Sequence, residues 1–148
     1  MSAALAIGMA APASAGVNDP EIILYRVPAV VDSGDGPLTG VATVFSCTNF
    51  SGVNENIRFA TRDSVGTLVS NLVFTTPHLT TRTFATHPVI AYSNAPLTTG
   101  QLTGGTTAIA ATSINIICTA MAIDASAAVP TGVALRAIRF NPVPGSQE

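Results

Sequence analysis

The amino-acid sequence predicts an all-β fold, an antiparallel β-sandwich of about seven to nine strands with one disulfide. Runs of β-branched and aromatic residues alternate with clusters of Gly, Pro, Asn and Asp at intervals of about ten residues, as is typical of such sandwiches. After residue 15, no segment has the apolar spacing of a helix of ordinary length. The two cysteines, Cys47 and Cys118, lie in the two most apolar runs, so a bridge between them would join the two halves of the chain.

The composition fits one domain, residues 16–148, because domains of about 100 to 150 residues bury enough surface to fold alone. Hydrophobic residues make up 47% of the chain but charged residues only 9%, against about 25% in an average protein. A net charge of -2 and the absence of lysine argue against nucleic-acid binding, which depends on clustered basic side chains. The low charge favours a protein that packs against copies of itself or a cell-surface polymer, although a compact monomer also fits.

Residues 1–15 resemble a signal peptide. An uninterrupted apolar run is followed by Ala13-Ser14-Ala15, the small-x-small pattern that precedes a cleavage site, which predicts cleavage before Gly16. We therefore expect a secreted, periplasmic or cell-surface protein. No Lys or Arg precedes the apolar run, which leaves a start codon upstream open, and an Ala-rich tail or a buried helix is the alternative interpretation. The run is too short to span a bilayer, so no membrane span is expected.

An exported chain with two cysteines favours a disulfide between Cys47 and Cys118. The closed loop of about seventy residues corresponds to roughly 4 kcal/mol of stabilisation in the chain-entropy model, as an upper figure. The bridge could join the two sheets or two neighbouring strands of one sheet. No His or Cys lies at metal-ligand spacing from either sulfur, so no metal and no cofactor is expected.

The strands are expected in the following order along the chain. The first, 22–31, contains Pro28, which predicts an edge strand or two short strands that meet at a kink. The runs 38–50 and 114–124 are apolar on both faces, which predicts central strands or a covered outer face. The run 55–63 alternates between apolar and polar residues, as in a half-exposed strand. Further strands are expected at 67–76, 78–87, 89–92 and 132–140, a short strand or helical turn at 106–111, and a loop at 93–105.

The order of these elements resembles a family of small exported bacterial β-sandwich proteins with an immunoglobulin-like fold and uncharacterised function. The likeness is carried by Cys47-Thr48-Asn49, by Arg62-Asp63 before the hairpin Gly66-Thr67-Leu68, and by Ile117-Cys118-Thr119-Ala120 before Asp124. It covers about residues 25–142. The resemblance implies the fold and an exported location, and it implies no catalytic residues. The Trp that usually packs on an immunoglobulin disulfide is absent from the sequence.

The segment Val30-Val31-Asp32-Ser33-Gly34 resembles the motif of aspartic proteases, in which two such aspartates share a proton and activate water. A chain with one copy would have to dimerise to complete the pair. The continuation through Asp35 reads instead as a turn, and we expect the turn. Asp32 and Asp35 also form a candidate ligand or calcium loop, although the further oxygen ligands of an EF-hand are missing.

Three arginines, Arg58, Arg62 and Arg82, form a candidate anion-binding face, for which a solvated sheet face is the alternative. His78 and His87 are expected at opposite ends of one strand, too far apart to share a metal. The run 100–105 lacks the Lys-Ser/Thr pair of a phosphate-binding loop and is expected to be a flexible loop. Asn49 begins a glycan acceptor motif, which matters only in a eukaryotic secretory route.

These observations favour an exported, non-catalytic structural or surface-interaction protein that associates with copies of itself. The alternative is a soluble module that binds a carbohydrate or small ligand through the loops 32–37 and 93–105. A hydrolase that uses Asp32 comes third, because the sequence offers no convergent acid, base and nucleophile.

Overall fold

A computed structural model describes residues 16–140, and all regular secondary structure in that range is β. The strands are β1 (Ile22–Asp32), β2 (Val41–Asn49), β3 (Glu55–Arg62), β4 (Leu68–Thr76), β5 (Thr81–Ala85), β6 (Asn94–Pro96), β7 (Leu102–Ala111), β8 (Ile116–Asp124), β9 (Gly132–Leu135) and β10 (Ile138–Arg139). The prediction of an all-β fold is confirmed. The predicted signal peptide lies outside the described residues. Between residues 16 and 140, no helix has the length and apolar character needed to cross a membrane.

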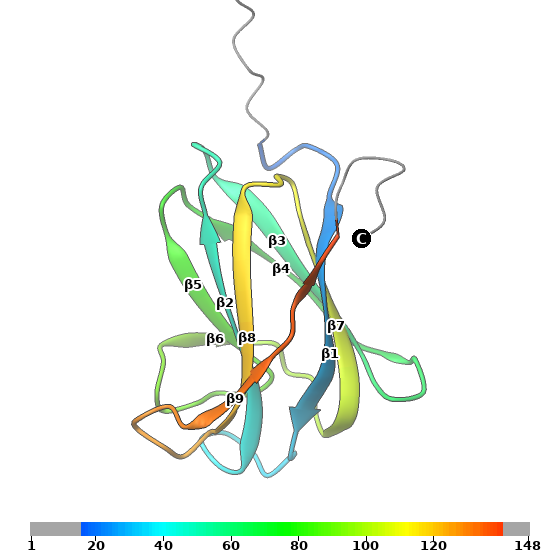
Figure 1. The fold of residues 1–148 in the computed structure, drawn as a ribbon, viewed down its shortest axis with the longest axis vertical. Helices are drawn as coiled ribbons and strands as arrows, with labels where there is room; N and C mark the ends of the chain where they lie inside the picture. The colour runs from blue at the N-terminus through cyan, green and yellow to red at the C-terminus, as the bar shows by residue number, and fades with distance from the viewer. Residues whose placement is uncertain (1–15, 141–148) are drawn as a thin grey trace, which may run out of the picture.

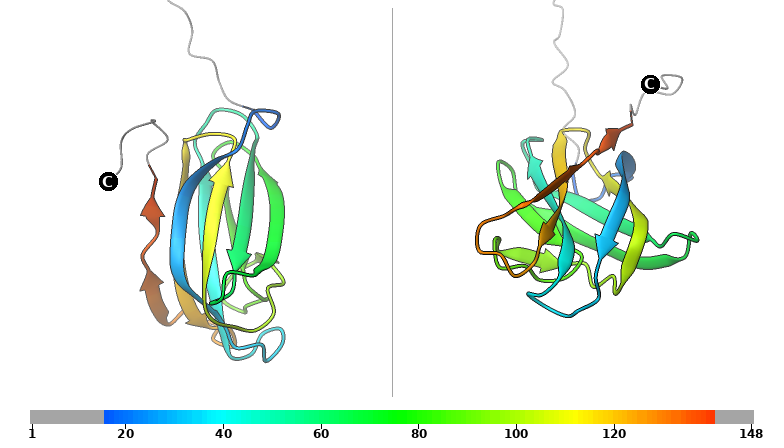
Figure 2. Two further views of the ribbon diagram at one scale, coloured as in Figure 1. Left: turned by 90° about the vertical axis from the view of Figure 1, so that its right-hand side faces the viewer. Right: turned by 60° about the horizontal axis from the view of Figure 1, so that its bottom comes forward.

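The strands form one curled, mixed sheet. Its main order is β4-β3-β7-β1-β2-β5-β6. β1 and β5 pair with different parts of one edge of β2, and β8 pairs with the opposite edge of β2. β9 then pairs with β8. All strand pairs are antiparallel except the pair of β5 with β6. The sheet curls like half a barrel, so that β4, β3, β7 and β1 face β8, β2 and β5 across the interior (Figures 1 and 2). The chain from β9 to β10 crosses from β8 to β1 and covers one side.

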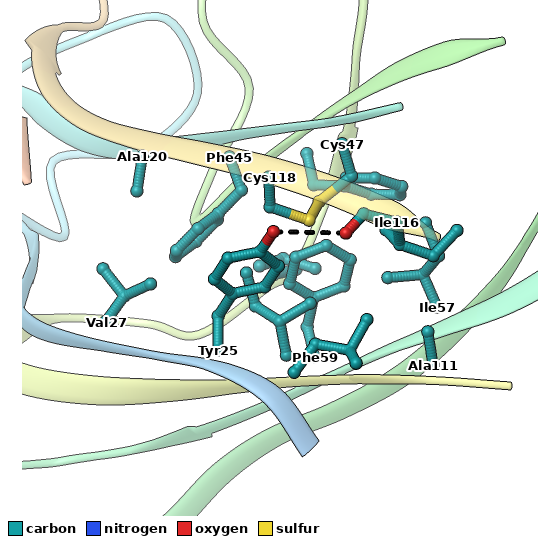
Figure 3. Close-up of a cluster of buried hydrophobic side chains, with 14 of the residues drawn as sticks. Tyr25, Val27, Phe45, Cys47, Ile57, Phe59, Ala111, Ile116, Cys118 and Ala120 are labelled. Atoms are coloured by element: carbon teal, nitrogen blue, oxygen red, sulfur yellow. Dashed lines mark hydrogen bonds between the residues drawn. A yellow bond between two sulfur atoms is a disulfide. The ribbon is translucent and has the colours of Figure 1, made fainter. Parts of the chain in front are cut away.

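A single apolar core fills the curl. Phe59 from β3 lies between Phe45 and Phe84, with ring centroids 5.6 and 4.5 Å away, and Phe74 from β4 is 4.9 Å from Phe84. Aromatic pairs at these separations contribute about 0.5 to 1.5 kcal/mol each beyond the burial of their area. On the side of β1, the Tyr25 hydroxyl donates to the carbonyl oxygen of Ile116 at 3.1 Å, so even the polar end of this buried side chain is satisfied (Figure 3).

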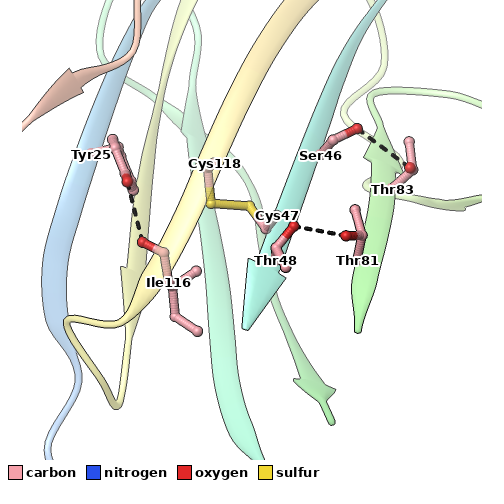
Figure 4. The surroundings of a disulfide bond; sticks show 8 residues. All are labelled: Tyr25, Ser46, Cys47, Thr48, Thr81, Thr83, Ile116 and Cys118. Atoms are coloured by element: carbon pink, nitrogen blue, oxygen red, sulfur yellow. Dashed lines mark hydrogen bonds between the residues drawn. A yellow bond between two sulfur atoms is a disulfide. The ribbon is translucent and has the colours of Figure 1, made fainter. Parts of the chain in front are cut away.

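The predicted disulfide between Cys47 and Cys118 is present. The two residues are direct partners in the ladder of β2 and β8, with Cα atoms 4.1 Å apart (Figure 4). Of the two arrangements that the sequence left open, the bridge is therefore the one between neighbouring strands. Both cysteines are buried in the core, where the bridge fixes the register of the two strands against each other.

The apolar residues on both faces of β2 have a structural explanation. Phe45 and Cys47 point into the main core, whereas Ala42 and Val44 point outward and form a second cluster with Ile123 of β8. The segment that follows β5 covers this cluster. The prediction of a strand at 89–92 is wrong, because these residues form no ladder. Their apolar side chains pack on the outer face instead.

Three other segments differ from the expectation. The expected loop at 93–105 is only in part a loop, because β6 (Asn94–Pro96) pairs with β5 and the ten-residue β7 begins at Leu102, where it pairs with both β1 and β3. Gly105 lies so close to the carbonyl of Arg62 that a Cβ atom would clash, so the glycine permits the pairing. The first strand is continuous but bulged near Pro28, and the last expected strand is split into β9 and β10.

Replacing both cysteines, Cys47→Ala with Cys118→Ala, should lower the free energy of unfolding by about 2 to 4 kcal/mol, because the unfolded chain regains the entropy of a long loop. Urea unfolding of the two proteins gives this difference. Adding a reductant should destabilise the wild type and leave the double variant unchanged. Equal stability of the two proteins would mean that the ladder of β2 and β8 holds without the bridge.

Candidate functional site

The outer face of β2, β5 and β8 has two parts. The segment after β5 covers one part, and the other part carries rows of hydroxyl groups. Thr48 pairs with Thr81 on one side, and Ser46 lies between Thr83 and Thr119. The hydroxyl oxygens of Thr48 and Thr81 are 2.7 Å apart, and those of Ser46 and Thr83 are 3.4 Å apart (Figure 4). We call these five residues the hydroxyl face. Each hydroxyl can both donate and accept, so the face can bind a polar partner without carrying charge.

Three large apolar side chains adjoin the hydroxyl face at one end. Phe50, Leu79 and Ile117 are 48%, 67% and 51% exposed. The N–H of Leu79 donates to the carbonyl of Asn49, and the N–H of Phe50 donates to the carbonyl of Asn115. These backbone contacts extend the pairing past Asn49, where Ile117 lies opposite Thr48, so the three residues belong to adjacent segments. We call them the apolar corner. Large contiguous apolar patches are typical of interaction surfaces, whereas apolar residues exposed singly are ordinary.

The backbone at Leu79 is left-handed. Its φ is 57°, in a region that residues with a β-carbon other than Asn and Asp seldom adopt. Ala29, Leu38 and Thr98 also have positive φ, so this conformation does not by itself single out Leu79. A Gly or Asn would adopt it at lower conformational cost.

Arg82 lies on the opposite side of β5 from the hydroxyl face. Its guanidinium carbon lies 5.7 Å from the ring centroids of both Phe74 and Phe84, and one of its nitrogens donates to the carbonyl of Thr75 at 2.8 Å. The side chain therefore spans the open side of the curl between β5 and β4. Its aliphatic stem and cationic plane cover the aromatic core.

The structure does not bring Arg82 together with the other two arginines of the candidate anion-binding face. Arg58 and Arg62 lie on the outer face of β3. Arg58 is bonded to Glu21, with its Nη2 3.2 Å from one carboxylate oxygen, and these contacts raise the pKa of Arg58 although partial burial opposes them. Arg62 donates to the carbonyl of Gly66 at 2.8 Å. The charge of Arg58 is thus already neutralised within the fold.

The two aspartates of the candidate calcium loop differ in their surroundings. Asp32 is 3% exposed, and its Oδ1 accepts the N–H of Gly34 at 2.8 Å, which forms a local turn. Asp35 is exposed. Within residues 16–140, no group of three or more His, Cys, Asp and Glu side chains is placed to hold a metal ion.

His87 makes two hydrogen bonds that the sequence did not indicate. Its Nδ1 lies 2.9 Å from Oδ2 of Asp32, and its Nε2 lies 3.0 Å from the carbonyl oxygen of Thr39. Both ring nitrogens are therefore engaged within the fold. The pair ties the loop after β1 to the segment after β5. His78 lies elsewhere, where its Nδ1 accepts the N–H of Gly52.

Replacing Asp32 by Ala should lower the free energy of unfolding by about 1 to 3 kcal/mol, because His87, the N–H of Gly34 and the hydroxyl of Thr99 lose a buried hydrogen-bond partner. Asp35→Ala is the matched control and should change stability by no more than about 0.5 kcal/mol, since Asp35 is exposed. Chemical unfolding measures both. Equally small effects would contradict a structural role of the Asp32 hydrogen bonds, and a calcium-dependent rise in melting temperature lost in both variants would support a calcium loop instead.

In residues 16–140, the apolar corner thus adjoins the hydroxyl face, whereas Arg82 lies on the opposite side of β5. Sequence reasoning indicated the Thr-rich strand and Arg82, but not that the apolar corner would form from three separate segments. No family model, no curated protein sequence and no solved structure matches this chain.

Proposed function

We propose that this chain is an exported, non-catalytic surface-interaction protein with an immunoglobulin-like β-sandwich arrangement, which associates with copies of itself through the hydroxyl face and the apolar corner. The observation that carries the proposal is the exposure of Phe50, Leu79 and Ile117 beside an uncharged hydroxyl-lined surface. Covering three large apolar side chains removes their area from water, which is the main driving force of protein association.

The chemistry of this surface suits a second copy of the chain. All side chains of the hydroxyl face and the apolar corner are uncharged, so two copies can approach without desolvating ions. Hydroxyl groups donate and accept, so a copy related by a two-fold axis offers matching partners, and the apolar corner is complementary to itself.

The proposed location and fold rest on separate observations. Disulfides persist in oxidising compartments, so the bond between Cys47 and Cys118 supports export, together with the small-x-small pattern that ends at Ala15. Two parts of one curled sheet facing each other across a single core support the sandwich arrangement.

Replacing Leu79 by Asn should weaken self-association about tenfold or more while leaving the fold intact or stabilised, because Asn tolerates the left-handed backbone. Sedimentation velocity over a concentration series of the full chain measures the association, and chemical unfolding measures stability. Val65→Asn is the matched control, since Val65 is 85% exposed at the hairpin between β3 and β4, away from the proposed interface.

Two results would count against this interface. The wild type could stay monomeric over the whole concentration series, or Leu79→Asn and Val65→Asn could weaken the association equally. A variant that unfolds would be recognised from its denaturation curve, and Ile117→Thr then tests the same corner from β8, where threonine suits a strand.

Protein recovered from its own cells should begin at Gly16 and contain no free thiol, if the chain is exported as proposed. Intact-mass measurement with and without a thiol-reactive label decides this. An unprocessed amino terminus together with reduced cysteines would contradict export, whereas failure of self-association alone would not.

A further inference from the structure

A polar pocket of about 350 Å³ opens at the edge of β5. Its lining residues are Thr81, Arg82, Thr83, Ser93, Asn94 and Ala95. The pocket arises because β6 pairs with β5 only from Thr83 onward, which leaves the edge at Thr81 and Arg82 uncovered by β6. Its volume lies within the range of ligand sites, about 300 to 1,000 Å³. The lining offers a cation, three hydroxyls and an amide, and no acidic side chain.

Arg82 brings an uncompensated positive charge to the pocket. Among residues 16–140, the arginine that pairs with a carboxylate is Arg58, with Glu21, so no described carboxylate neutralises Arg82. One of its nitrogens is engaged with the carbonyl of Thr75, and the guanidinium group has five N–H donors in all. Contact with Phe74 and Phe84 holds the side chain in place. A preorganised guanidinium of this kind is suited to a carboxylate.

Asn94 forms a fixed part of the pocket wall. Its amide nitrogen donates to the carbonyls of Val89 and Tyr92, at 3.1 and 2.7 Å, which fixes the orientation of the side chain. Its Oδ1 is buried, so the contribution of Asn94 is to shape the wall beside Thr83.

We propose that this pocket binds a sugar acid, a pyranose ring that carries a carboxylate beside its hydroxyl groups. The carboxylate pairs with Arg82, and the hydroxyls of Thr81, Thr83 and Ser93 bind the ring hydroxyl groups. The lining combines one cation with three hydroxyls and has no acidic side chain, which suits a ligand with one carboxylate and several hydroxyl groups. The pocket shares Thr81 and Thr83 with the hydroxyl face but shares no residue with the apolar corner. Leu79→Asn therefore changes self-association without changing the lining of the pocket, which keeps the two proposals distinguishable.

The test is titration of the full chain with sodium glucuronate and with glucose, followed by NMR chemical shifts. Glucose has the same ring with a neutral hydroxymethyl group in place of the carboxylate. We expect glucuronate to bind with a Kd in the range of about 1 mM or tighter, and glucose at least tenfold more weakly. The resonances that move should be those of the pocket residues. An oligosaccharide of glucuronate that binds far more tightly than the monomer identifies a polymer as the source, and equal affinity identifies the free sugar.

Two variants separate binding from folding. Arg82→Gln should reduce glucuronate affinity at least tenfold, and Ser93→Asp should do the same by repulsion, without loss of stability because Ser93 is exposed. Arg62→Gln is the matched control, since it removes an arginine from the outer face of β3. Equal affinity for glucose and glucuronate, undiminished binding by Ser93→Asp, or no shift of pocket resonances with either the monomer or the oligosaccharide would overturn the proposal.

Discussion

The pairing of β2 with β8 is the contact on which the rest of the structure depends. The ladder runs through nine residue pairs from Val41 to Asn49, and the disulfide closes it at Cys47 and Cys118. β2 is also the strand on which β5 pairs, so the pocket at the edge of β5 inherits its position from this ladder. A shift of one residue in this register would exchange every inward side chain for an outward one, which the buried bridge opposes.

The same ladder produces both the core and the proposed interaction surface. Because side chains alternate along a strand, Phe45 and Cys47 enter the core while Ser46 and Thr48 must point outward. The outer face then divides by composition. Its aliphatic part is covered by the segment after β5, its hydroxyl part is open, and its end carries Phe50 and its apolar neighbours. The chain thus covers the aliphatic part of this face and leaves Phe50, Leu79 and Ile117 exposed.

Structural features that arise from neighbouring residues could be predicted from the sequence, whereas features that depend on contacts between distant residues could not. The alternation of 55–63 and the double apolar faces of the cysteine strands are local patterns, and the structure confirmed both. The strand β7 was underestimated because Gly104 and Gly105 resemble a loop, whereas Gly105 is required by close approach to Arg62. The bond between Asp32 and His87 joins residues 55 positions apart and leaves no sequence signal.

The surface sites show the same limit. The sequence indicated three arginines as one anion-binding face, but strand pairing separated Arg82 from the others and placed it against two phenylalanine rings. The amide nitrogen of Asn94 donates to two backbone carbonyls, and this contact fixes the side chain within a segment that was expected to be a loop. Composition could therefore indicate a protein with an interaction surface, but the location of that surface required the register of the strands.

The most direct test of the central claim is hydrogen–deuterium exchange of the full chain at increasing protein concentration. Amides of residues 48–50, 79–83 and 117–119 should exchange more slowly as copies associate through the outer face, while the hairpin between β3 and β4 should be unaffected. Protection that appears at that hairpin instead, or exchange that does not change with concentration at any residue, would contradict the account.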